Sequence, residues 1–354
     1  MQSVGLKTAI WNNNLRSMAL VALYPLTITL MVWCVVALSG ATLLYGEHYS
    51  SPFESDGSGV WRYAIAAANE FIVAYWPTIF GVVGCWFLIA AFFHTRMIRM
   101  LSRARPVDRT DEPELYNLLE NICISRGLQM PRLEVIETDA RNAFASGIDT
   151  KSYSITVTRG LLQSLQRDEL EAVLGHELTH IMNNDVRLLI ISIIFTGMIG
   201  FACQLYWSGI RHSLYMGRGK RDGRVIIFLM AIGAVLWVGY IATTLTRFAI
   251  SRRREFMADA GAVELTKNPD ALMRALLRIS GADQLPGSTE DIAMMCIENN
   301  HKFLGVLSTH PKLDDRLKAI ADATQMPLPD LEAGRAATGA FQRVQDPPVR
   351  DPWA

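Results

Sequence analysis

The sequence predicts a mainly α-helical membrane protein with about four transmembrane helices and an α+β cytoplasmic domain that contains a small sheet. Half of the 354 residues are hydrophobic and only 19% are charged, which is typical of membrane proteins. Charge-free apolar runs account for this balance, and they cover residues 18–38, 77–93, 188–205 and 225–245. Each run is long enough to cross a bilayer as a helix.

The first two runs predict the orientation of the chain. Small residues at 37–41 allow a signal-peptide interpretation, but the run at 18–38 is too long for a typical signal peptide, so we favour an uncleaved anchor. A basic cluster follows the second run: Arg96, Arg99, Arg103, Arg105 and Arg109. By the positive-inside rule, the N-terminus and the chain after about residue 95 are cytoplasmic. The acidic stretch at 39–75 is then an extracytoplasmic loop.

The third and fourth runs form a helical hairpin whose depth the charges do not decide. Basic residues lie both between the runs and after the fourth run, so the positive-inside rule has no clear solution. A shallow or re-entrant hairpin is one alternative, and a spanning hairpin, favoured by length, is the other. The basic residues between the runs are suited to anionic lipid headgroups, so membrane lipids are expected partners.

Charge and cysteine content exclude other classes. The formal net charge is zero, so the chain lacks the basic surplus of a nucleic-acid-binding protein. Three of its five cysteines lie in apolar runs, and no two have the spacing of zinc ligands. This is not a disulfide framework, and it points to a reducing compartment for the soluble region.

Outside the apolar runs, local patterns predict short helices and strands. Helical spacing predicts helices over about 112–126, 169–182, 248–266, 270–279 and 313–323, and Gly127 is expected to close the first of them. Strands are expected at 133–136 and 153–158. Alternation of Tyr153, Ile155 and Val157 with polar residues is typical of a half-buried strand. The small residues at 142–147 indicate a loop, and a Gly/Pro/Ser-containing loop follows at 281–291. A disordered tail is expected over 326–354.

One motif on a predicted helix has the residues of a metal-binding site. His176, Glu177 and His180 form H-E-x-x-H, and on a helix the two histidines share a face, so both imidazoles can reach one ion. Such a helix supplies two zinc ligands and a carboxylate placed to take a proton from metal-bound water. A chance match is the alternative. Asp168, with Glu171 three residues later, resembles a capping box and supports a helix, and Asn183-Asn184-Asp185 offers a natural end to it.

A third zinc ligand is expected after the fourth apolar run. Glu255 and Asp259 are four residues apart and share a helix face. Glu255 can bind zinc, while Asp259 can accept an N–H from a zinc-bound imidazole and orient it. An ordinary solvated acidic pair is the alternative for an isolated E-x-x-x-D, but its place behind H-E-x-x-H favours the metal site.

Four motifs in this order resemble the HtpX family of integral-membrane zinc metalloproteases, which are related to the CAAX prenyl endopeptidases. They are Asn142-Ala143-Phe144, His176-Glu177-x-x-His180, Glu255-x-x-x-Asp259 and Ser308-Thr309-His310-Pro311. The resemblance covers nearly the whole chain and implies a gluzincin-like protease domain with one Zn²⁺. The C-terminal tail is not explained by it.

The resemblance also implies a role for each site residue. His176, His180 and Glu255 would bind zinc, Glu177 would be the general base, and Asp259 would orient a histidine. Asn142 and Ala143 would contact an extended polypeptide substrate, and His310 and Arg316 would lie near the developing oxyanion or the substrate. A structural His-Pro turn and a surface arginine are the alternatives for the last two.

The expected organisation follows from the motifs and the apolar runs. It comprises N-terminal transmembrane helices (1–95), a first protease-domain segment (96–187), the hairpin (188–245), a second protease-domain segment (246–325) and the tail (326–354). The implied function is cleavage of cytoplasmic regions of damaged or misfolded membrane proteins, a quality-control and stress-response role at a bacterial inner membrane. A membrane scaffold or regulator with a non-catalytic zinc site is the alternative. Four spans are too few to enclose the large chamber of a prenyl-peptide protease.

Overall fold

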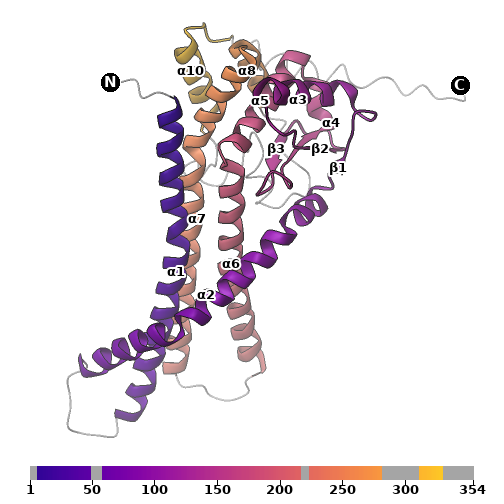
Figure 1. Cartoon of the computed structure of the whole chain (residues 1–354). Coiled ribbons are helices and arrows are strands. Elements are labelled where there is room, and N and C mark those ends of the chain that lie inside the picture. The colour runs from indigo at the N-terminus through magenta and orange to yellow at the C-terminus, as the bar shows by residue number, and fades with distance from the viewer. Residues whose placement is uncertain (1–5, 49–57, 217–222, 281–310, 330–354) are drawn as a thin grey trace, which may run out of the picture. The chain divides into compact units, whose positions relative to one another are not determined.

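The computed structural model describes residues 6–48, 58–216, 223–280 and 311–329, and Figure 1 shows its helices and its one small sheet. The chain separates into two compact units. The membrane-helix unit comprises Leu15–Phe93 and Ile191–Ala249, and the sheet unit comprises Met1–Asn14, His94–Ile190 and Ile250–Ala354. The predicted loop at 281–291, His310 and nearly all of the predicted tail lie outside the described residues.

Long apolar helices make up the membrane-helix unit. They belong to α1 (Leu6–His48), α2 (Ser58–Ser102), α6 (Asp185–Met216) and α7 (Gly223–Thr266). Stretches long and apolar enough to cross a membrane cover Ala22–Thr42, Gly59–His94, Asp185–His212 and Val225–Thr246. Each overlaps one of the predicted apolar runs, so the expectation of about four transmembrane helices is confirmed.

The expected loop over residues 39–75 is wrong in its extent. Helix α1 continues to His48 and helix α2 already begins at Ser58. Alanines favour this extension, because alanine has the highest helix propensity and its small side chain lets helices approach closely. Ala64 is fully buried, and a Cβ added at Gly40 of α1 would lie 3.6 Å from the Ala64 Cα. The charged residues Arg62 and Glu70 lie within α2 and do not interrupt it.

The sheet unit contains four strands: β1 (Arg105–Pro106), β2 (Arg132–Ile136), β3 (Ala143–Ser146) and β4 (Ser154–Thr158). Their order is β1-β2-β4-β3. The central pair β2 and β4 is parallel, whereas β1 and β3 pair with their neighbours in the antiparallel direction. Strand β3 therefore lies at one edge of the sheet.

Two sequence-based expectations about this sheet are wrong. Residues 143–146 form strand β3 rather than a loop, and β4 is buried on both faces rather than one. Polar residues tolerate burial when they find partners inside the sheet. The Ser154 and Ser146 hydroxyls lie 2.7 Å apart, and Thr158 Oγ1 donates to the backbone carbonyl of Asn142 at 3.0 Å.

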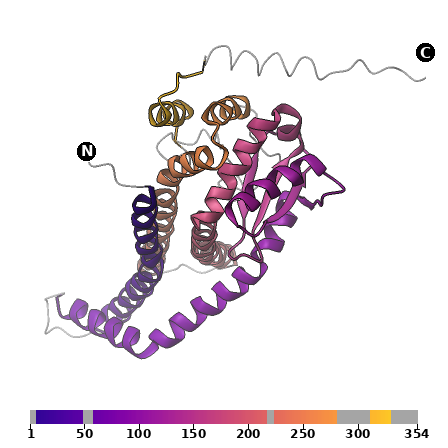
Figure 2. The same cartoon turned by 45° about the horizontal axis from the view of Figure 1, so that its top comes forward.

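The described part of the sheet unit also contains five shorter helices: α3 (Pro113–Arg126), α4 (Arg159–Ser164), α5 (Arg167–Met182), α8 (Pro269–Ile279) and α10 (Leu313–Thr324). Helix α3 ends as predicted at Gly127, whose φ of 64° favours glycine. Helix α5 lies beside the sheet in both views (Figure 1 and Figure 2). The helices predicted over 112–126, 169–182, 270–279 and 313–323 are thus present within two residues of the expected bounds, whereas the one predicted over 248–266 is the last part of α7.

One apolar cluster joins α5, α7, α8 and α10. Its buried members are Ala172, Ala262, Ala271, Leu272, Met273, Leu276, Leu277, Leu317, Ile320 and Ala321. Burial of apolar side chains contributes about 25 cal/mol per Å² removed from water, so this cluster holds the four helices together. It also brings residues that are far apart in the sequence to one place.

The capping box of α5 lies two residues before the predicted one. The backbone N–H of Gln166 donates to Glu169 Oε2 at 2.9 Å, so Gln166 and Glu169 replace Asp168 and Glu171 in this role. Glu169 is fully buried and forms ion pairs with Arg274 at 3.2 Å and Arg278 at 3.0 Å. This carboxylate ties the start of α5 to helix α8.

Candidate metal centre

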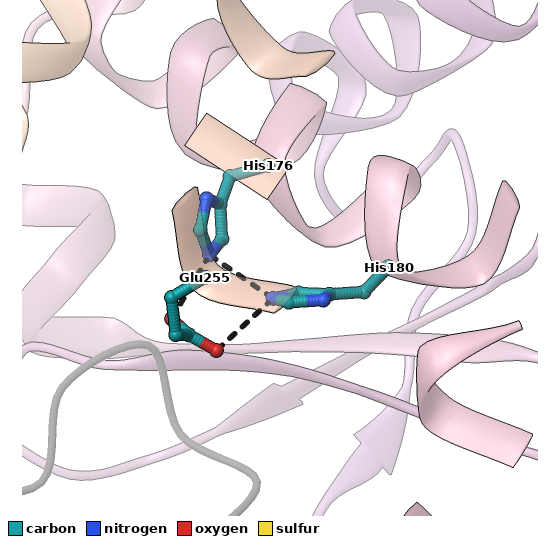
Figure 3. A group of neighbouring side chains, drawn as sticks. All are labelled: His176, His180 and Glu255. Atoms are coloured by element: carbon teal, nitrogen blue, oxygen red, sulfur yellow. Dashed lines mark hydrogen bonds and ion pairs between the residues drawn. The ribbon is translucent and has the colours of Figure 1, made fainter. Parts of the chain in front are cut away.

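Three potential metal ligands converge in the sheet unit. His176 and His180 stand one turn apart on α5, and Glu255 reaches them from α7, as Figure 3 shows. The two histidine Nε2 atoms lie 3.2 Å apart. A Glu255 oxygen lies 3.8 Å from Nε2 of His176 and another lies 3.6 Å from Nε2 of His180. Among the described residues, these three form the one cluster of this kind.

This arrangement fits a tetrahedral metal ion. With zinc–ligand bonds of roughly 2.0–2.1 Å, neighbouring ligand atoms in a tetrahedron are separated by roughly 3.3 Å. The two Nε2 atoms are separated by 3.2 Å, close to that value, and each has one of the two Glu255 oxygens slightly further away, at 3.8 and 3.6 Å. Two imidazole nitrogens and a carboxylate are a usual zinc-binding set, and three protein ligands leave one coordination position for water or substrate.

Each histidine is oriented by a carboxylate. Nδ1 of His176 lies 3.0 Å from Asp259 Oδ1, and Nδ1 of His180 lies 3.0 Å from Asp185 Oδ2. When Nδ1–H points at a carboxylate, Nε2 carries the lone pair that a metal needs. Both Nε2 lone pairs then face one another and the Glu255 carboxylate, and a cation between them offsets their repulsion.

Arginines hold both orienting carboxylates. Arg316 on α10 makes two parallel contacts with Asp259, at 2.9 Å and 2.7 Å, and Arg254 on α7 donates to Asp185 Oδ1. All four side chains are buried. Asp185 and Arg254 were not among the predicted site residues, because the sequence suggested a helix end for the first and a membrane-flanking basic cluster for the second. Their signal in the sequence was only their closeness to His180 and Glu255.

Charges in the centre favour a cation at the imidazoles. Burial disfavours a charged His180, but its hydrogen bond to Asp185 and the nearby Glu255 carboxylate raise the pKa of His180 to about 9. Burial also works against the ionised form of Asp259, yet the Arg316 guanidinium lowers the pKa of that carboxyl to about 2. The carboxylate of Asp259 therefore stays charged and can accept a hydrogen bond from Nδ1 of His176.

The Glu177 carboxylate lies near the three potential ligands. It is only 2% exposed, and burial raises the pKa of Glu177 against the opposing effect of the two histidines. A carboxyl with a raised pKa is better suited to take up and release a proton near neutral pH. A hydrogen bond with the backbone of Ala145 links Glu177 to strand β3.

Helices α5 and α7 meet through small residues. A Cβ added at Gly261 would lie 2.3 Å from the Thr179 Cγ2, and one at Gly175 would lie 3.2 Å from the Thr266 Cγ2. Thr179 cannot move aside freely, because its hydroxyl donates to the Gly175 carbonyl at 2.7 Å. Close approach of the two helices therefore sets the distance between the histidines and the third ligand.

We expect Gly261→Leu to separate these helices and weaken metal binding. Overpacking of this kind destabilises a protein by about 1–3 kcal/mol, and the larger side chain also moves Glu255 away from the histidines. The matched control is Ala260→Leu, because Ala260 is the exposed neighbour on the same helix. Thermal unfolding and bound metal are measured for both variants. Equal metal content in the two variants would contradict this prediction.

The other predicted site residues are distributed around the centre. Asn142 is fully buried just before β3, where its Oδ1 accepts the backbone N–H of Ala143 at 2.9 Å. Arg316 contacts Asp259 at the centre, and its Nη1 lies 3.8 Å from Glu255 Oε2. Substrate contacts by Asn142, Ala143 and Arg316 stay predictions, and His310 lies outside the described residues.

Within the described ranges, four helices long and apolar enough to cross a membrane accompany a His-His-Glu cluster with an adjacent carboxylate, as expected of an integral-membrane metalloendopeptidase. A family model described as Peptidase family M48 matches residues 109–324. The chain belongs to this family, whose members are in general zinc-dependent.

Curated relatives agree with this assignment. A Protease HtpX homolog of Bacteroides fragilis (strain YCH46) is 39% identical over 328 residues, which cover 90% of this chain and 98% of the relative. A Protease HtpX homolog of Lactobacillus acidophilus is 37% identical over 237 residues, or 63% of this chain and 78% of the relative. These matches confirm the predicted HtpX-type membrane metalloprotease. The crystal structure of S. mikatae Ste24p also matches, with 22% identity and a TM-score of 0.45 over 71% of this chain and 60% of that chain.

Proposed function

We propose that the chain is a zinc-dependent endopeptidase that cleaves cytoplasmic regions of damaged or misfolded membrane proteins. The observation that carries the proposal is the convergence of His176, His180 and Glu255 with Glu177 beside them. A structural zinc site normally has four protein ligands, whereas a hydrolytic site has three and an open position. Three potential ligands are found among the described residues, with the Glu177 carboxylate near them, and this supports a hydrolytic site.

In the proposed hydrolysis, each residue of the centre has its own role. His176, His180 and Glu255 would hold a zinc ion, which lowers the pKa of a water and polarises a carbonyl when bound. Glu177 takes a proton from the attacking water and passes it to the leaving amine, so its raised pKa suits both steps. Asp259 and Arg316 keep the His176 ring oriented, and burial keeps bulk water away from these charges.

Strand β3 is the proposed docking edge for the substrate. It pairs only with β4 among the described strands, and an extended peptide can add to such an edge through main-chain hydrogen bonds. Its residue Ala145 is hydrogen-bonded to Glu177, so a peptide along this edge would pass the base. This position supports an unfolded or extended polypeptide as substrate, with Asn142 and Ala143 at the start of the docking edge.

The proposed location is a bacterial inner membrane with the N-terminus and the centre in the cytoplasm. Bacterial relatives and the arginines after the second span support it. The centre is close in sequence to a span, because Asp185 is the first residue of α6. A protease held there can reach loops of other membrane proteins. Activity of a cytoplasmic reporter fused at the C-terminus tests the orientation, and activity of a periplasmic reporter at that position would contradict it.

The zinc requirement is tested on the full chain purified in detergent. We expect one zinc per chain by elemental analysis and cleavage of β-casein. The chelator 1,10-phenanthroline should abolish cleavage and added zinc should restore it, while the weakly chelating 1,7-isomer serves as the control. Undiminished cleavage by the metal-depleted protein would overturn the proposal. Bound zinc without cleavage of casein or a membrane-protein substrate would favour the scaffold or regulator alternative.

A further inference from the structure

The support of the second histidine comes from the ends of the two hairpin helices. Asp185 is the first residue of α6, and Arg254 lies on α7 directly before Glu255. Oδ2 of Asp185 lies 3.0 Å from Nδ1 of His180, while its other oxygen accepts from Arg254 Nη1. The two residues are 69 positions apart in the chain and meet at the metal centre.

The two histidines have matched supports of different origin. His176 is held by Asp259 and Arg316, and the Glu255-x-x-x-Asp259 motif already suggested the carboxylate of this set. The corresponding set at His180 is Asp185 and Arg254. In both sets a buried arginine holds a buried carboxylate that contacts an imidazole Nδ1. The repetition of this arrangement argues that it serves the metal ligands rather than the local packing of one helix.

We propose that Asp185 is a positioning residue for His180 and that Arg254 holds Asp185 in that role. The carboxylate fixes the Nδ1–H tautomer of His180, so that Nε2 is free to bind a metal. Arg254 compensates the buried charge, which is costly when left alone. The inference rests on the proposed function. It assigns to the hairpin ends a role in metal binding that goes beyond supplying Glu255.

A role at the N-terminus of α6 is the competing explanation for Asp185, since a negative charge there stabilises the helix dipole. Asp185→Asn removes this charge as well, so thermal unfolding of the metal-free protein is measured beside zinc affinity, and a loss of stability with wild-type zinc affinity would support the helix-terminus role instead. In this variant Arg254 recruits the amide oxygen, because a charged donor prefers the acceptor. The amide NH₂ then faces His180 Nδ1 and stabilises the Nε2–H tautomer, which cannot bind a metal through Nε2.

The test measures zinc affinity of the full chain in detergent by competition with a chromophoric chelator. We expect Asp185→Asn to weaken zinc binding by about 10- to 100-fold, the usual effect of losing such a partner, and to change the visible absorption of the cobalt-substituted protein. Asp185→Glu, which keeps the carboxylate, should recover some of the affinity. Arg187→Gln is the control, because Arg187 is exposed two positions further along α6.

A second measurement tests whether Asp185 and Arg254 act as a pair. In a double-mutant cycle, Asp185→Ala and Arg254→Ala should weaken zinc binding together by less than the product of their separate effects, because the pair acts as a unit. Wild-type zinc affinity in Asp185→Asn, or independent effects in the cycle, would overturn the inference. Absence of zinc from the wild-type protein would instead refute the proposed function, so the two failures are distinct.

Discussion

Glu177→Gln should retain zinc and lose proteolysis by about 1,000-fold, within the range found for removal of a general base. The substitution keeps the size of the side chain and leaves all three proposed ligands in place. It removes the carboxylate that accepts the proton from water. Zinc content and cleavage of β-casein are measured on the same preparation, so that loss of the metal and loss of the base are told apart.

Glu171→Gln is the matched control for this prediction. Glu171 lies on the same helix, about one and a half turns before Glu177, and is partly exposed. The control should keep both zinc and activity. Full activity in Glu177→Gln would show that another group is the base, whereas loss of its zinc would indicate that Glu177 supports the metal.

Glu255→Gln should lower zinc affinity by more than about 100-fold, beyond the effect of losing an outer partner. Glutamine removes the one negative charge among the three proposed ligands and offers a poorer donor atom for zinc. Activity should fall in proportion to the lost metal at low zinc concentration. Titration with a competing chelator measures the affinity, and cleavage assays at increasing zinc concentrations separate weak binding from a damaged fold.

The same helix provides a control for the third ligand. Glu264 lies further along α7, where its side chain is about half exposed and pairs with Arg126 at 3.4 Å. Glu264→Gln should leave zinc affinity unchanged, because exposed ion pairs contribute little. Equal zinc affinity in Glu255→Gln and the wild-type protein would remove Glu255 from the metal site.

Patterns within a few residues were predictable from the sequence. Apolar runs predicted the four spans, and the i, i+4 spacing of the histidines placed them on one face of α5. Helix α3 and its glycine end were likewise expected. Such features depend on hydropathy and on local backbone preference, and both are determined by residues that are close in the sequence.

Features that depend on distant partners were harder to predict. Strand β3 was expected to be a loop, because its strand conformation depends on pairing with β4. The polar residues of β4 suggested an exposed face, but their hydrogen-bond partners lie on β2 and next to β3. The helical stretch from Ser58 onward was expected to be a loop, because its packing on α1 is not visible in its composition.

By itself, the sequence determined the class of this protein: its four spans, the H-E-x-x-H helix and the acidic pair of the third ligand. Only the tertiary structure showed that Asp185 lies against His180 and which arginines hold the two carboxylates beside the histidines. Asp185 and Arg254 are 69 residues apart, and Asp259 and Arg316 are 57 apart. A buried ion pair forms only where packing brings both charges together and excludes water. Such a long-range contact cannot be predicted from the spacing of the residues in the sequence, whereas a helix can be predicted from the periodicity of its own residues.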